Sequence, residues 1–122
     1  MSERRHNQRV ILERAKGLIE KYGWVQGKLG HVDIGYCLKG AVDRAEVLQS
    51  IGEESCMSPS AASVSAQDAC YLLRRLANMR LIFNEDEGAI PVYNDTPGRT
   101  KGEILDLLDE AINDTYVRIM EG

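Results

Sequence analysis

The spacing of apolar and polar residues predicts a mainly helical chain. Between residues 8 and 22 the apolar positions recur every three or four residues, which is the period of a helix with one buried face. Asn7 is the expected N-cap, and Gly23 is the expected residue past the last turn, where left-handed backbone ends a helix. The residues expected to face the core are Val10, Ile11, Ala15, Leu18, Ile19 and Tyr22.

Two further segments, residues 36–51 and 59–79, show the same helical period. Gly40 and Ala41 leave almost no side chain on one turn of the first segment. We expect a neighbouring helix, a bulky ring or a ligand to approach closely there. The stretch that precedes this helix, residues 26–35, holds three glycines and is expected to be irregular.

Local signals mark where the later helices begin. Ser58 followed by Pro59 is typical of an N-cap and a first helical residue, and it comes after a polar linker. This helix is expected to break near residues 63–65. Thr100 and Glu103 form a capping box, which predicts a last amphipathic helix that runs to the C-terminus.

Two short apolar runs, residues 81–83 and 89–93, predict a small β-hairpin with a five-residue loop. A helix followed by a hairpin is also the order of a winged helix. The tip of such a wing would be acidic, at residues 85–87, and a DNA backbone would repel it. The expected fold is therefore one domain, residues 1–122, of about four helices with a minor β-hairpin. A second half that resembles a winged helix stays open as an alternative.

Charge and composition narrow the classes of function. The formal charge is −4, yet residues 1–16 carry five basic and two acidic side chains, and residues 84–122 carry three basic and ten acidic ones. A basic first helix is expected to meet an acidic last one, either across the fold or across a dimer, so self-association stays open. An acidic chain is a poor general binder of nucleic acid.

The same composition predicts a cytoplasmic protein without a resident cofactor. No apolar run approaches the length that spans a bilayer, and the first residues lack the apolar core of a signal peptide. Three cysteines without CxxC spacing favour a reducing compartment. Two histidines without ligand spacing give no convincing metal site.

Cys37 is the candidate for catalytic chemistry. A thiol near a helix N-terminus has its thiolate favoured by the helix dipole. His31 and Asp33 lie just upstream, and they or Asp95 would supply a base and an orienting group. The alternative is that Cys37 is a small buried apolar residue, which is the common fate of a free cysteine.

Five polar or aromatic residues near helix ends are the candidates for ligand binding. Asn94 and Asp95 would bind a polar ligand, or else satisfy backbone N–H groups in a turn. Arg99 would grip an anion beside a helix N-terminus, or else pair with a neighbouring carboxylate. Trp24 and Gln26 would hold a planar ligand, or else Trp24 packs beneath the end of the first helix.

Three motifs resemble those of an uncharacterised family of small phage and bacterial proteins. They are Gly-Trp-x-Gln-Gly at residues 23–27, Cys-x-x-Gly-Ala at 37–41 and Asn-Asp-x-Pro-Gly-Arg-Thr at 94–100, followed by an amphipathic helix. The resemblance covers most of the chain, its last motif is the most specific, and residues 52–88 match only as generic helical sequence. It implies no known activity. It does imply a phage or mobile-element setting, in which small proteins commonly bind host machinery.

These observations lead to one expected function and two alternatives. We expect a non-catalytic binding protein, encoded by a phage or a mobile element, that engages a host protein or a small ligand. The first alternative is a thiol-dependent enzyme that uses Cys37, and the second is a winged-helix DNA-binding regulator.

Overall fold

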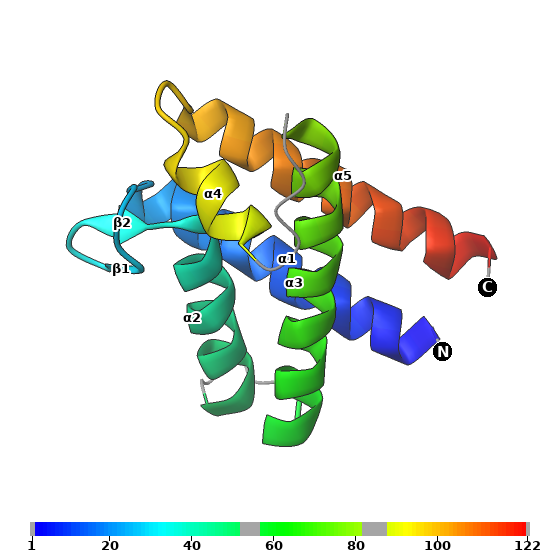
Figure 1. The fold of residues 1–122 in the computed structure, drawn as a ribbon. Coiled ribbons are helices and arrows are strands. Elements are labelled where there is room, and N and C mark those ends of the chain that lie inside the picture. The colour runs from blue at the N-terminus through cyan, green and yellow to red at the C-terminus, as the bar shows by residue number, and fades with distance from the viewer. Residues whose placement is uncertain (1, 52–56, 82–87, 122) are drawn as a thin grey trace.

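The computed structural model describes residues 2–51, 57–81 and 88–121, which form five helices and one two-stranded sheet (Figure 1). In chain order the elements are α1 (Ser2–Tyr22), β1 (Gly30–His31), β2 (Gly35–Tyr36), α2 (Leu38–Ile51), α3 (Pro59–Arg80), α4 (Ala89–Asp95) and α5 (Lys101–Glu121). The two strands are antiparallel, with Gly30 opposite Tyr36 and His31 opposite Gly35. The prediction of a mainly helical chain with a minor β-hairpin is confirmed.

Helix α1 packs against α2, α3 and α5 and is the centre of the fold. Helix α5 runs antiparallel beside α1, and both chain ends lie on the same side of the molecule (Figure 1). Two polar contacts between side chains are among those that join this pair of helices. The Lys16 ammonium lies 2.6 Å from an Asp109 carboxylate oxygen, and Arg9 donates to the Tyr116 hydroxyl at 3.1 Å. The expected meeting of a basic first helix with an acidic last one therefore occurs within one chain.

One hydrophobic core joins all five helices, because each contributes small or aliphatic side chains to the same cluster. The largest apolar side chains with almost no exposed surface are Ile11, Leu12, Ile19, Leu38, Val42, Leu73, Tyr93, Ile104, Leu107 and Leu108. No helix in the described part of the chain has both the length and the hydropathy needed to cross a membrane.

The predicted helix ends at Gly23, Ser58 and Thr100 are confirmed. The Gly23 N–H donates to the Ile19 carbonyl at 2.9 Å, with φ at +100°. The Ser58 hydroxyl accepts from the Ala61 N–H at 3.2 Å. Thr100 Oγ1 accepts from the Glu103 N–H at 3.2 Å, and Glu103 Oε1 accepts from the Thr100 N–H at 3.0 Å, which completes the capping box.

Two predictions about helix boundaries are wrong. Helix α1 begins at Ser2, so Asn7 is not its cap. Arg4 holds the Asp68 carboxylate of α3 through two hydrogen bonds of 2.7 and 2.9 Å, and the Gln8 amide donates to the Asp68 carbonyl at 2.9 Å. Helix α3 runs without the expected break: Ala62, Ser65 and Ala66 are all buried there, and the Ser65 hydroxyl donates to the Ala61 carbonyl at 2.7 Å, so its polar group is satisfied within the helix.

The predicted second strand of the hairpin is also wrong, because residues 89–95 form α4. Its buried residues, Ala89, Ile90, Tyr93 and Asn94, have helical spacing, and Pro91 lies in the first turn, where a missing N–H costs nothing. Most of the predicted first strand and of the loop after it lies at residues 82–87, outside the described residues. Most of the predicted polar linker lies at residues 52–56, which are also outside them. Without the second strand there is no wing, so the winged-helix alternative is not supported.

The observed hairpin lies instead in the glycine-rich stretch that was expected to be irregular. A Cβ on Gly30 would lie 2.2 Å from the Gly35 carbonyl oxygen, so only glycine permits this close strand pair. Tyr36 belongs to β2, and its N–H and carbonyl bond to the Gly23 carbonyl and the Val25 N–H at 2.9 and 3.2 Å. Helix α2 consequently begins two residues later than expected, at Leu38.

Candidate functional site

Asn94, at the end of α4, is the point where the three motifs meet. Its side chain is 1% exposed. Its amide oxygen accepts from the Trp24 indole N–H at 2.7 Å and from the Leu38 backbone N–H at 3.0 Å. Its amide nitrogen donates to the Val25 carbonyl at 3.0 Å and to Asp95 Oδ1 at 2.9 Å. The Asn94 amide is thus fully bonded and fixes α4 to the turn after α1 and to the start of α2.

Gln26 and Asp95 strengthen the same connection. Gln26 Nε2 donates to the carbonyls of Asn94 and Thr96, at 3.0 and 3.1 Å. Asp95 Oδ1 accepts from the Gly27 N–H at 2.9 Å. The turn at residues 23–27 is therefore bonded to the end of α4 across about seventy residues of sequence.

Arg99 is occupied by neighbouring groups. Its guanidinium carbon lies 3.8 Å from the centre of the Tyr93 ring, and its Nε donates to the Tyr93 carbonyl at 2.8 Å. Its Nη1 lies 3.0 Å from a Glu103 carboxylate oxygen. The Thr100 N–H, and after it Arg99, hold the pKa of Glu103 below its usual value. Arg99 therefore pairs with a neighbouring carboxylate, as the alternative interpretation predicts, and its observed contacts are not those of an anion-binding side chain.

Cys37 is the N-cap of α2 and is nearly buried, at 8% exposed. Its sulfur accepts from the Gly40 N–H at 3.3 Å, and its N–H donates to the Leu29 carbonyl at 3.1 Å. Burial raises the pKa of the Cys37 thiol, although its hydrogen bonds to backbone N–H groups act in the opposite direction. The thiol is therefore held in its protonated form at neutral pH.

Beside this network lies a cleft of 490 Å³, which we call the motif cleft. Its walls come from residues 27–29, the start of α2 with the residue before it, the middle of α3 and both ends of the short helix α4. Leu29, Ile90 and Pro91 give it an apolar surface. Cys37 and Cys70, both free thiols, line it as well.

Charged groups also line the motif cleft. Lys28, Lys39 and Arg74 are its basic residues, and Asp95 is its acidic one. The Lys39 ammonium pairs with Asp43 at 2.5 Å, with both side chains nearly half exposed. Burial raises the pKa of the Cys70 thiol, while Lys39 and Arg74 act to lower it.

The structure divides the predicted site residues into two groups. Cys37, Asn94 and Asp95 line the motif cleft. Trp24, Gln26 and Arg99 do not line it, and their bonds instead support α4 and the turn after α1. The observed contacts of Trp24 and Cys37 agree with the structural alternatives, in which Trp24 packs beneath the end of the first helix and Cys37 is a small buried residue.

Sequence reasoning did not place Lys28, Lys39, Cys70 and Arg74 in a binding site. One signal was available for two of them. Cys70 and Arg74 are four residues apart in α3, so they share a helix face, and a thiol beside a guanidinium on one face indicates a partly buried polar position. Lys28 and Lys39 come from other segments, and only the fold brings them to the same cleft.

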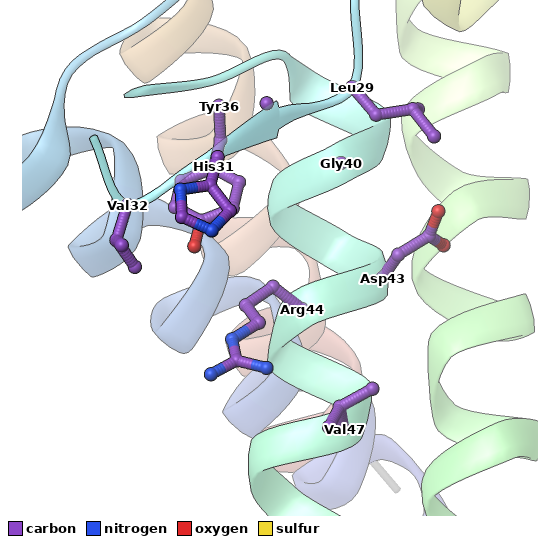
Figure 2. A pocket seen from close by; sticks show the side chains of 9 residues that line it. Leu29, His31, Val32, Tyr36, Gly40, Asp43, Arg44 and Val47 are labelled. Atoms are coloured by element: carbon purple, nitrogen blue, oxygen red, sulfur yellow. The ribbon is translucent and has the colours of Figure 1, made fainter. Parts of the chain in front are cut away.

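A second pocket of 370 Å³, the hairpin pocket, lies between the β-hairpin and the outer face of α2 (Figure 2). Figure 2 shows His31 and Val32 of the hairpin facing Arg44 and Val47 of α2. His31 Nδ1 lies 3.4 Å from an Asp33 carboxylate oxygen, and both side chains are largely exposed. His31 thus lines a different pocket from Cys37, and the expected thiol–imidazole pair does not share a site.

A resident metal has no obvious ligand set in the described part of the chain. No three His, Cys, Asp or Glu side chains there lie together in a way that could hold a metal ion.

The family model for DUF6197, a family of unknown function, matches residues 3–114. The chain belongs to this family. The match extends over the motif cleft and the hairpin pocket, so this DUF6197 domain includes both. No curated protein and no solved structure matches the chain. The resemblance of the three motifs to a family of small phage and bacterial proteins stays a prediction.

Proposed function

We propose that this DUF6197 protein is a non-catalytic binding protein and that it takes a small organic ligand in the motif cleft. The observation that carries the proposal is the cleft itself. Its volume, 490 Å³, lies within the range of about 300–1,000 Å³ typical of small-molecule sites. Apolar walls with a few convergent polar groups are the usual composition of such a site.

The Asn94 network supports this proposal because it makes the cleft preformed. Asn94 bonds at once to the turn after α1 and to the first N–H of α2, two of the segments that line the cleft. A cleft fixed before the ligand arrives loses less conformational entropy on binding than a flexible one.

The geometry around Cys37 favours binding over thiol catalysis. We expect Cys37 in the folded protein to react with iodoacetamide at pH 7 at least tenfold more slowly than in urea, because the thiol is buried and its pKa is raised. The rate should increase with pH as the thiolate forms. Peptide mass spectrometry after timed quenching measures each cysteine separately. Labelling of Cys37 as fast as in urea would restore the enzyme alternative.

A neutral fluorescent probe, N-phenylnaphthylamine, tests the proposal. We expect saturable binding at one site in the wild-type protein, because the probe is aromatic, apolar and small enough for the cleft. Cys70→Phe should abolish that binding, since the added ring occupies the cleft. Cys70→Ala, which removes volume at the same position, should retain it.

Thermal melting of both Cys70 variants provides the control for folding. The proposal is contradicted if a folded Cys70→Phe protein binds the probe as the wild type does. Mass spectrometry of small molecules released when the purified wild-type protein is denatured identifies a natural ligand that stays bound during purification.

Engagement of a host protein, and the phage origin that goes with it, remain predictions. Four exposed apolar side chains around the β-hairpin, those of Leu29, Val32, Ile34 and Val47, form the surface that favours a protein partner. They are between 37% and 58% exposed. Three of them, Leu29, Val32 and Val47, line the hairpin pocket together, and exposed apolar groups that gather in this way are typical of interaction sites.

A further inference from the structure

The side chains that line the motif cleft are mostly basic, whereas the whole chain is acidic. The chain has a formal charge of −4, yet three basic side chains line this cleft against one carboxylate, Asp95. One Asp95 oxygen already accepts two hydrogen bonds, from the Gly27 N–H and from the Asn94 amide. Among the side chains that line the cleft, basic groups therefore outnumber carboxylates.

Two of the basic groups come from neighbouring helices. Lys39 lies in the first turn of α2 and Arg74 lies in α3, and both are close enough to Cys70 to act on its thiol. The ion pair of Lys39 with Asp43 is nearly half exposed to water, so it is weak and a ligand can compete for it. Among the described residues Arg74 has no carboxylate partner, and its guanidinium lies 5.5 Å from the centre of the Tyr71 ring.

Building on the proposed function, we propose that the ligand of the motif cleft is a small organic anion. Its charged group lies between Lys39 and Arg74, and its apolar body lies against Leu29, Ile90 and Pro91. A guanidinium and an ammonium on two sides suit a carboxylate, sulfonate or phosphate, because each donates charge-assisted hydrogen bonds to its oxygens.

The surroundings of the cleft favour a small anion over a polyanion. Asp43 and Glu46 on α2 face the same Cys70 thiol and oppose the two basic groups. A nucleic acid that approached Lys39 and Arg74 would also meet these carboxylates, which repel its phosphates.

Two probes that differ by a single charged group test this proposal. Anilinonaphthalene sulfonate has the ring system of N-phenylnaphthylamine with an added sulfonate. We expect the wild-type protein to bind the sulfonate about tenfold more tightly, and this preference to shrink as salt is added.

The double variant Lys39→Gln/Arg74→Gln should bind the sulfonate about tenfold more weakly and the neutral probe within about twofold of wild type. Arg75→Gln is the matched control. This exposed arginine is adjacent in α3 and also lies near Tyr71, at 5.9 Å, but it does not line the cleft. It should leave both affinities unchanged.

The outcomes separate this inference from the proposed function. If both probes bind equally well and the double variant changes neither, the cleft binds ligands but the anion assignment is wrong. If Arg75→Gln weakens the sulfonate as much as the double variant does, the effect is general surface charge, and the assignment is again wrong. If neither probe binds in the cleft, the proposed function fails as well.

Discussion

Replacing Asn94 with alanine is expected to lower the free energy of unfolding by about 3 kcal/mol. The substitution removes four hydrogen bonds at once. It leaves the buried Leu38 N–H and the partly buried Val25 carbonyl without these partners, and each unsatisfied buried group costs about 1–3 kcal/mol. Urea denaturation followed by circular dichroism measures the change.

Asn113→Ala is the matched control for this prediction. Asn113 is an exposed residue of α5, so the same chemical change there should alter the free energy of unfolding by less than about 0.5 kcal/mol. A loss below about 1 kcal/mol in Asn94→Ala would mean that the motifs are held together by packing and not by this amide.

Asn94→Asp tests the donor side of the same residue. A carboxylate still accepts from Trp24 and Leu38, but it cannot donate to the Val25 carbonyl or to Asp95, and it adds a buried charge beside Asp95. Burial and this neighbour raise the pKa of the introduced carboxyl in the folded state. The deficit relative to wild type should therefore be largest at pH 7 and should shrink as the pH falls through that raised pKa.

The sequence predicts those parts of the fold that local chemistry determines. The apolar stripe of α1 and the ends at Gly23, Ser58 and Thr100 depend on residues within one or two turns, and each is confirmed. The first turn of α1 instead contacts Asp68, sixty-four residues away from Arg4, and no local signal contains that contact.

The misread segment at residues 89–93 shows a different limit. These five residues, one of which is a proline, fit an edge strand as well as a first helical turn. A run this short has no periodicity to decide between the two structures. What decides is tertiary contact. As a helix, the segment buries the Tyr93 side chain in the core and brings the Asn94 amide to Trp24 and Leu38.

The candidate site could be predicted only in part, for the same reason. Asn94 and Cys37 stand out because polar residues at helix ends carry specific local bonds. Lys39 and Arg74 are ordinary surface residues in the sequence, and they become a pair only because α2 and α3 pack side by side. The character of the cleft therefore comes from the packing of helices rather than from any motif.

Replacing Gly40 with alanine is expected to destabilise the protein by about 3 kcal/mol. The new Cβ would lie 1.9 Å from the Leu29 carbonyl oxygen and 2.7 Å from the Leu29 carbonyl carbon, so backbone has to move. That movement breaks the hydrogen bond from the Cys37 N–H to Leu29. The free-energy cost of the clash and of the lost hydrogen bond has to exceed the stabilisation of about 1 kcal/mol that alanine brings to a helix interior relative to glycine. Urea denaturation gives the net effect.

Gly17→Ala separates the clash from helix propensity. Gly17 lies exposed in α1, and nothing lies within 4 Å of a Cβ built there, so this variant should be more stable by about 0.5–1 kcal/mol.

The same pair of variants tests the cleft, because Leu29 lines it and has to shift only in Gly40→Ala. We expect Gly40→Ala to weaken N-phenylnaphthylamine binding and Gly17→Ala to leave it unchanged. Stabilisation by both substitutions would show that the Leu29 backbone yields easily and that the notch at Gly40 does not hold the cleft in shape.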